Sequence, residues 1–506
     1  MSKTAVSFKG VTKTFGEVTA NKNVDLDIKE GEILSLLGEN GSGKTTLMNM
    51  LAGIYFPDAG QIYIGDKPVN IGSPKDAFDL GIGMVHQHFK LIDVLTAAEN
   101  IVLGLDGKLN LKEAEKKIRE ICDRYGFEVD LQKKIYNMSV SEKQTVEIVK
   151  VLYRGAEILI LDEPTAVLTP QETEKLFNVM RNMKADGKSI IIITHKLHEV
   201  KAISDRVAVL RKGEFIGEMI TSESDEQQMT NMMVGRQVSL NIDRKPPVNV
   251  KERLVVKNLT VKDQTGIPKV KDVSFTANSG EILGIAGISG CGQRELLESI
   301  AGLRKAESGN VFFCEDGKEK VDLIGKDPEI INQMGVSLSF VPEDRLGMGL
   351  VGNMDLADNM MLRSFRSGKS KIFTDRRSPR DLAETVVNEL DINTPGIDTP
   401  VRRLSGGNVQ KVLVGREIAS HPSVLMTAYA VRGLDINSSY TIYDLLNKQK
   451  ESGTAVIYVG EDLDVLLELS DRILVLCDGE VSGIVDAPAT DKNTLGLLMT
   501  KKGGGE

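Results

Sequence analysis

One stretch near the N-terminus says most about this chain: Gly38-Glu39-Asn40-Gly41-Ser42-Gly43-Lys44-Thr45-Thr46. Its glycines permit a loop in which backbone N–H groups converge on phosphate oxygens. Lys44 adds a positive charge for the phosphates, and the Thr45 hydroxyl adds a ligand for Mg²⁺. These residue types at this spacing predict a complete phosphate-binding loop.

The surroundings of this loop return 249 residues later, as Gly287-Ile288-Ser289-Gly290-Cys291-Gly292-Gln293-Arg294-Glu295. The segments before the two loops also match, as Gly31-Glu32-Ile33-Leu34 and Gly280-Glu281-Ile282-Leu283. A repeat of this length indicates that a whole domain has been copied. The second copy keeps the glycines but has Gln293 in place of the lysine, so only the first copy has the residues for chemistry.

The composition limits the class of protein. A length of 506 residues suffices for two domains of ordinary size, each with its own core. The net charge is −9 and no long cationic run occurs, which makes nucleic acid a poor partner because phosphate-backbone binding depends on clustered Lys and Arg. The four cysteines form no CxxC pair, which favours a reduced cytosolic chain over a disulfide framework or a zinc site. No apolar run reaches the roughly 18 residues of a membrane span, and the first residues do not form a signal peptide.

The pattern of apolar residues predicts an α/β fold in both halves. Runs at 158–161, 190–193 and 207–210 have the largely β-branched composition of buried strands, and they alternate with helical patterns. A helix is expected to start at Asn110, with Glu113 as its capping-box partner. The apolar stripe of that helix predicts core packing and consists of Ile118, Ile121, Cys122 and Tyr125.

Two prolines near the middle of the chain mark the division between the halves. They lie in Ile242-Asp243-Arg244-Lys245-Pro246-Pro247-Val248-Asn249, which predicts an extended linker because proline removes a donor and fixes the backbone. We expect a first domain over 1–240, a linker over 241–252, a second domain over 253–500 and a flexible tail over 501–506.

Further polar residues of the first half follow predicted strands. The run at 158–161 ends in Asp162 and Glu163, an arrangement that brings one acid to Mg²⁺ and a second to an attacking water. His195 follows the run at 190–193, a position from which a histidine contacts a γ-phosphate or orients water.

These motifs resemble the ATP-binding cassette ATPases over the whole N-terminal half. Phe15 matches the aromatic residue that stacks on adenine, and Gln87 matches the Q-loop glutamine. Asp162 and Glu163 match the Walker B aspartate and the catalytic glutamate, and His195 matches the switch histidine.

The resemblance implies two tandem cassettes, each with a P-loop α/β core, an antiparallel β subdomain and a helical signature subdomain. ATP is the implied nucleotide, and the implied ligands of Mg²⁺ are Thr45, Gln87 and Asp162. The implied catalytic residues are Lys44, Gln87, Glu163 and His195. In this family two cassettes pair head to tail, so that ATP lies between the Walker A loop of one and the LSGGQ-type signature of the other.

The second half carries the signature that is closer to the family pattern, Leu404-Ser405-Gly406-Gly407-Asn408-Val409-Gln410-Lys411. A serine hydroxyl and unhindered glycine amides at a helix N-terminus form an anion site for the γ-phosphate. The first half reads Met138-Ser139-Val140-Ser141-Glu142-Lys143-Gln144, with Ser141 where the family has glycine. We expect that side chain and the nearby acid to weaken the approach of phosphate.

Most other motifs of the second half are degraded. Ala428 and Tyr429 stand in place of the two Walker B acids, Glu461 replaces the switch histidine, Glu343 lies near the Q-loop position, and no aromatic residue between Leu259 and Phe275 matches Phe15. Asp435 retains the D-loop aspartate of the family. We therefore expect one hydrolytic site, which combines the first-half motifs with Ser405, Gly406, Gly407, Asn408 and Asp435, and one site that cannot hydrolyse ATP.

The type of cassette protein is narrowed by these features. The chain most resembles the ATPase subunit of an importer for nucleosides or simple sugars, and the segments 290–296, 341–345 and 165–170 carry this resemblance. Met84-Val85-His86-Gln87-His88-Phe89 resembles the nucleoside-importing branch of this family, which implies a nucleoside in preference to a sugar such as ribose or galactose. A soluble twin-cassette translation or ribosome factor is the alternative of another class, but the short proline-containing linker is atypical of it. The intact first half argues against a non-catalytic scaffold.

An importer subunit implies partners in a membrane. Integral-membrane permease subunits are expected to dock on 91–103 and 350–362, and an extracellular substrate-binding protein would act on the complex indirectly. The chain is then expected at the cytoplasmic face of the cell membrane as a peripheral subunit, with its halves paired head to tail.

Overall fold

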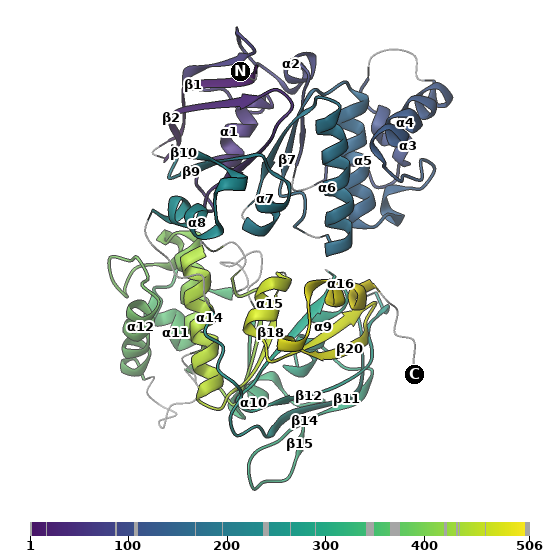
Figure 1. Cartoon of the computed structure of the whole chain (residues 1–506). Helices are drawn as coiled ribbons and strands as arrows, with labels where there is room; N and C mark the ends of the chain where they lie inside the picture. The colour runs from purple at the N-terminus through teal and green to yellow at the C-terminus, as the bar shows by residue number, and fades with distance from the viewer. Residues whose placement is uncertain are drawn as a thin grey trace. The chain divides into compact units, whose positions relative to one another are not determined.

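The computed structural model describes residues 3–16, 18–86, 89–105, 110–166, 168–194, 196–235, 242–263, 265–288, 290–340, 349–364, 375–418, 422–431, 434, 436–460 and 462–500. The chain forms two compact units, which divide between residues 239 and 240 (Figure 1). No helix in these described ranges is both long and apolar enough to cross a membrane.

The first unit combines two sheets with helices. Its described strands are β1 (Thr4–Phe15), β2 (Val18–Lys29), β3 (Ile33–Leu37), β4 (Ala59–Ile64), β5 (Lys67–Val69), β6 (Ile82–Val85), β7 (Ile158–Asp162), β8 (Ser189–Ile193), β9 (Arg206–Arg211) and β10 (Glu214–Ile220). Its described helices are α1 (Lys44–Leu51), α2 (Pro74–Asp79), α3 (Ala97–Val102), α4 (Leu111–Tyr125), α5 (Val140–Tyr153), α6 (Pro170–Ala185), α7 (Leu197–Ile203) and α8 (Glu226–Val234), with 3₁₀ turns η1 (Ile135–Asn137) and η2 (Thr221–Glu223).

The central sheet of the first unit has the strand order β10-β9-β3-β8-β7-β6. Strands β3, β6, β7, β8 and β9 run parallel, and β10 pairs antiparallel with β9. One face of this sheet shares a core with α1 and the antiparallel sheet β2-β1-β4-β5, and the other face packs against α5 and α6, with α3 and α4 packed on α5 (Figure 1). Because both faces are covered, alternate residues of each strand enter different cores, and β3, β7 and β8 are buried throughout.

The second unit has the same plan. Its described strands are β11 (Glu252–Lys262), β12 (Pro268–Asn278), β13 (Ile282–Gly287), β14 (Ser308–Phe313), β15 (Val321–Asp322), β16 (Val336–Phe340), β17 (Val424–Ala428), β18 (Ala455–Val459), β19 (Arg472–Cys477) and β20 (Glu480–Asp486). Its described helices are α9 (Gln293–Ile300), α10 (Pro328–Gln333), α11 (Leu356–Ser364), α12 (Arg377–Glu389), α13 (Gly406–Ile418), α14 (Ile436–Glu451), α15 (Leu463–Leu469) and α16 (Lys492–Thr500), with 3₁₀ turns η4 (Val401–Arg403) and η5 (Ala487–Ala489). The sheets β12-β11-β14-β15 and β16-β17-β18-β13-β19-β20 repeat the strand orders of the first unit.

The duplication extends to individual ion pairs at the edge of the core. A carboxylate and a guanidinium that are both largely buried meet in each unit, at 2.8 Å for Glu32–Arg206 and 2.5 Å for Glu281–Arg472. The pairs Lys184–Asp205 and Lys450–Asp471 are likewise equivalent, at 2.6 and 2.7 Å. The structure therefore confirms two copies of one α/β fold.

The strands and the helix predicted from the apolar pattern are also confirmed. The three runs form β7, β8 and β9, and the expected helix is α4, with Asn110 at its N-cap. Ile118, Cys122 and Tyr125 are buried, and burial raises the pKa of the Cys122 thiol to about 11, as suits a cysteine that only packs in a core. Only one of the two hydrogen bonds of the predicted capping box is present. Asn110 accepts a hydrogen bond from the Glu113 N–H, but the Glu113 carboxylate lies near Lys117.

The described part of the proline-containing segment packs on the second unit. Ile242 is buried in its core, and Arg244 donates hydrogen bonds to the carbonyls of Leu467 and Ser470 at 2.9 and 2.6 Å. Lys450 donates to the Lys245 carbonyl. These contacts fix the backbone on both sides of Asp243, so the segment belongs to the second unit from residue 242 onward. The predicted tail 501–506 lies outside the described residues.

Candidate functional site

The predicted phosphate loop lies between β3 and α1 in the first unit, at the carboxyl end of the central strands. Two of its glycines are required by close backbone neighbours. A Cβ on Gly38 would lie 2.3 Å from the Leu210 carbonyl oxygen, and one on Gly43 would lie 2.2 Å from the Ala20 carbonyl oxygen. Gly43 is also the N-cap of α1 in a left-handed conformation, which turns the first amides of the helix toward the loop.

Lys44 is held inside this loop. Its side chain is buried, and Nζ donates hydrogen bonds to the carbonyls of Gly38 and Glu39 at 2.7 and 3.0 Å. Burial lowers the pKa of Lys44, and the negative charges of Glu163 and Asp162 oppose that shift. The Ser42 hydroxyl is buried as well and has no hydrogen-bond partner among the described residues. A buried cation, an orphaned hydroxyl and a glycine cradle fit a phosphate group.

The first Walker B acid lies beside the loop. Thr45, exposed at the start of α1, donates through Oγ1 to Asp162 Oδ2 at 3.3 Å. Asp162 is buried at the end of β7, and burial together with the charge of Glu163 raises its pKa to about 6. A cation between these two poorly solvated acids and the phosphates would stabilise the ionised form of both acids. Thr45 and Asp162 therefore fit a divalent metal such as Mg²⁺.

Glu163 follows Asp162 in an uncommon backbone conformation. Its φ is 48°, in the left-handed region that non-glycine residues rarely adopt, and its N–H donates to the Ile193 carbonyl at 2.9 Å. This bond ties the end of β7 to the end of β8, so the residue leaves the sheet at the edge where the phosphate loop begins.

Phe15 lies in the β1–β2 hairpin, whose second strand approaches the phosphate loop. It ends β1 and pairs with Val18, two residues before Ala20, whose carbonyl leaves no room for a side chain at Gly43. The ring is 43% exposed, a high value for phenylalanine. An exposed aromatic ring beside a phosphate cradle is suited to stacking on a base. Asn40, Gly41 and Thr46 complete the predicted loop residues, and the first two of these are exposed.

Three predicted residues, Gln87, His195 and Asp435, lie outside the described residues, as do Glu343 and Glu461. The structure does describe the ends of the strands that precede Gln87 and His195. Val85 ends β6 and Ile193 ends β8, and both strands run parallel to β7.

The predicted signature of the second unit starts α13. Ser405 Oγ accepts hydrogen bonds from Asn408, at 3.4 Å from its N–H and 3.0 Å from Nδ2, which leaves the serine hydrogen to donate elsewhere. Gly406 and Gly407 begin the helix, and a Cβ on Gly407 would meet nothing closer than 3.8 Å. No acid occurs in the first turn of α13, so its amide dipoles are open to an anion.

The first-unit signature differs in one physical respect. Ser139 caps α5, and the Glu142 carboxylate folds back to accept from the Ser139 N–H at 2.7 Å while pairing with Lys133 at 2.7 Å. The N-terminus of α5 is therefore already neutralised by its own carboxylate. The sequence indicated that an acid lies near this end but not that it forms the cap itself.

The second phosphate loop keeps the shape of the first. Gly290 and Gly292 have φ values of 87° and 97°, against 81° and 96° for Gly41 and Gly43. Gln293 is buried and donates through Nε2 to the Ile288 carbonyl at 3.2 Å, the same tether in neutral form. Ala428 ends β17 and Tyr429 follows it, at the positions where the first unit has its acids.

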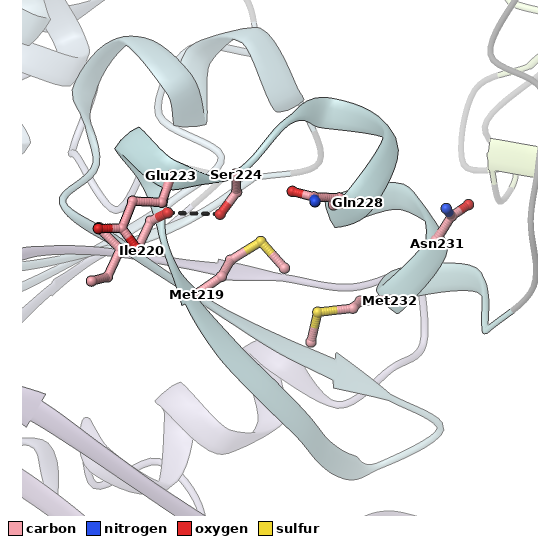
Figure 2. A pocket seen from close by; sticks show the side chains of 7 residues that line it. All are labelled: Met219, Ile220, Glu223, Ser224, Gln228, Asn231 and Met232. Atoms are coloured by element: carbon pink, nitrogen blue, oxygen red, sulfur yellow. Dashed lines mark hydrogen bonds between the residues drawn. The ribbon is translucent and has the colours of Figure 1, made fainter.

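A separate pocket of about 540 Å³ lies between β10, η2 and α8 of the first unit (Figure 2). Met219 and Met232 point toward one another across it, below Ser224 and Gln228. The polar groups are largely used within the fold, because Ser224 Oγ donates to the Ile220 carbonyl and Gln228 Oε1 accepts from the Asp225 N–H. None of the predicted site residues lines this pocket.

Comparison with known proteins places these observations in context. The model of the ABC transporter family matches residues 21–166 and 270–427. A nucleoside import ATP-binding protein of Lactococcus lactis subsp. cremoris is 42% identical over 98% of each chain. A guanosine import ATP-binding protein of Bacillus subtilis is 41% identical over 98% of this chain and 97% of its own. A glucose import ATP-binding protein of Haloferax volcanii is 40% identical over 98% of this chain and 96% of its own.

Proposed function

This chain belongs to the ABC transporter family of ATP-binding proteins, and on that premise we propose that it is the ATP-hydrolysing subunit of a nucleoside importer. The observation that carries the proposal is the unequal state of its two nucleotide loops. Lys44 and Asp162 form one site around Thr45, whereas Gln293 and Ala428 leave the other without a cation or an acid.

The nucleoside assignment rests on the relatives. The nucleoside and guanosine import proteins match almost the whole chain at 42% and 41% identity. The glucose import protein, at 40%, supports import of a simple sugar as the second candidate. These three importer subunits match at full length, which disfavours a ribosome factor.

The proposed hydrolytic site is composite. Lys44 and the amides of the loop would bind the phosphates, and the γ-phosphate would also meet Ser405 and the glycine amides of α13 from the second unit. Thr45, Asp162 and Gln87 would hold Mg²⁺, which neutralises charge on the phosphates when bound. Phe15 would stack on the base.

The remaining residues would act on the water and the γ-phosphate. Glu163 orients the attacking water or accepts its proton, and His195 contacts the γ-phosphate. Asn408 and Asp435 complete the contribution of the second unit. Pairing of the two units would be favoured because one chain carries both, which raises their effective concentration.

The permease subunits are proposed to dock on similar exposed apolar segments in the two units. Ile92 and Val94 are 44% and 66% exposed in the first unit, and Val351 and Met354 are 41% and 37% exposed in the second. Side chains of this kind on a surface are suited to an apolar partner. The assignment puts the chain at the cytoplasmic face of the membrane, with the extracellular binding protein acting through the permease.

A buried asparagine supports each segment in the same way. Asn100 accepts from the Ile92 N–H at 2.7 Å and donates to its carbonyl at 3.1 Å. Asn359 makes the equivalent bonds to Val351 at 2.9 and 3.1 Å. Both units thus hold an apolar segment rigidly at the surface, as a docking element requires.

Uptake measurements test the proposed function. Cells that lack this chain should regain uptake of a labelled nucleoside when the wild-type chain is restored, but not when Lys44→Ala is restored. Restored uptake of ribose or glucose without nucleoside would favour the sugar importer. Co-purification with ribosomes rather than integral membrane proteins would contradict both.

A further inference from the structure

The strand that carries Phe15 is anchored by one carboxylate. Asp58 accepts from Lys13 Nζ at 2.8 Å and from both the N–H and the hydroxyl of Thr14 at 2.7 Å. Its own N–H donates to the Thr12 carbonyl at 2.8 Å. These hydrogen bonds lower the pKa of Asp58 to about 2, and the bond from Lys13 has the largest effect. The Asp58 carboxylate is therefore ionised at physiological pH. The three residues before Phe15 are therefore fixed.

The Phe15 ring itself is supported by a second aromatic residue. The ring of Tyr55 lies edge-on to it, with centroids 5.1 Å apart and planes at 72°. Tyr55 packs against the core of the first unit, and its N–H donates to the Asn49 carbonyl of α1 at 3.2 Å. The exposed ring of Phe15 is thus held by a ring that is anchored to α1, the helix that follows the phosphate loop.

Comparison with the second unit separates the carboxylate anchor, which both units share, from the aromatic support of Phe15. A carboxylate anchor is present there as well: Glu307 stands in place of Asp58, its N–H donates to the Thr260 carbonyl at 2.8 Å, and its carboxylate pairs with Lys262, which stands in place of Thr14, at 3.0 Å. Arg304 takes the place of Tyr55 and makes the same backbone bond, with its N–H donating to the Glu298 carbonyl at 3.2 Å.

The side chain of Arg304 forms an ion pair instead of an aromatic contact. Its guanidinium donates to the Glu298 carboxylate at 2.9 and 2.7 Å. The carboxylate anchor is thus present in both units, whereas the aromatic support occurs only beside the loop that retains its lysine. This difference separates a structural element from one that serves the nucleotide.

We propose that Tyr55 positions Phe15 for a purine base and so sets the preference of the first site for purine over pyrimidine nucleoside triphosphates. This inference rests on the proposed function. A ring that is already fixed loses less freedom on binding, so more of the stacking energy contributes to affinity. A purine gains more from such a platform than a pyrimidine, because its two fused rings cover more of it.

The test measures KM and kcat for ATP and CTP with the full-length chain. Loss of one aromatic pair corresponds to about three- to tenfold, so Tyr55→Leu should raise the KM for ATP by that factor and leave kcat within about twofold. The ratio of kcat/KM for ATP over CTP should fall in the same variant. Tyr55→Phe keeps the ring and should keep the wild-type ratio, and Arg304→Leu serves as the matched control in the second unit.

The alternatives give different results. Equal losses for ATP and CTP, or a lower melting temperature with no change in the ratio, would assign Tyr55 a structural role only and overturn the inference. An unchanged KM for ATP would do the same. If the Lys44→Ala variant hydrolyses ATP at the wild-type rate, the proposed function itself fails, and this inference fails with it.

Discussion

Glu163 and Tyr429 show how a single backbone conformation is retained while the chemistry changes. Both have a left-handed φ, of 48° and 58°, and both donate their N–H to the last residue of the next strand, at 2.9 Å to Ile193 and 3.0 Å to Val459. The unusual conformation therefore belongs to the strand end and is present without a catalytic acid. The carboxylate, not the strain, distinguishes the active copy.

That distinction yields a prediction for Glu163. Replacing it with glutamine preserves size and backbone but removes the group that accepts a proton, so Glu163→Gln should lower turnover by about 10²–10⁴-fold. Binding of ATP should stay close to wild type, because the loop and Lys44 are unchanged. Steady-state turnover and equilibrium binding of a nucleotide check the two parts separately. Turnover near the wild-type rate would remove Glu163 from the mechanism.

At the scale of elements, the two signature helices differ in whether their N-termini are free. The α5 terminus is covered by the Glu142 carboxylate, whereas the first turn of α13 contains no acid. Both helices are capped by a serine, Ser139 and Ser405. We expect the two serine caps to contribute similarly to folding stability, but only α13 presents its amides to an external anion.

A matched pair of variants tests this difference. Loss of either serine cap should cost about 1 kcal/mol of folding stability, as N-caps commonly do. Ser405→Ala should also lower ATP turnover by about tenfold or more, the usual effect of losing a hydrogen bond to a charged group. Ser139→Ala should leave turnover within about twofold of wild type, since its helix faces the neutral loop in the proposed pairing. Denaturant unfolding and turnover are measured on both, and equal losses of turnover would contradict the assignment.

Much of the fold and of the site could be predicted from the sequence. The repeat and the glycine spacing determine the loop, and apolar runs determine strands that are buried on both faces. The role of Tyr55 could not be predicted, because its contact with Phe15 depends on how a turn packs against a hairpin 40 residues earlier. The folding of Glu142 onto its own N-cap is likewise invisible to a motif, which reports the residue but not its hydrogen bonds.

At the scale of the whole molecule, the chain is two copies of one fold with unequal chemistry. The chain passes from the first unit to the second between Gly235, which ends α8, and Ile242, which is buried in the second core. One chain that carries both units would raise the effective concentration of each for the other, which suits the proposed site assembled from both. In the proposed pairing, the loop with Lys44 meets the open α13, and the loop with Gln293 meets the covered α5.

The central claim is that one of the two loops hydrolyses ATP, and a comparison of Lys44→Ala with Gln293→Ala tests it most directly. Both variants truncate the residue that is tethered inside its loop, so they perturb equivalent positions. ATP turnover is measured on each full-length variant together with its melting temperature. We expect Lys44→Ala to abolish turnover and Gln293→Ala to leave it nearly unchanged. Equal losses of turnover in two folded variants would contradict the claim of a single hydrolytic site.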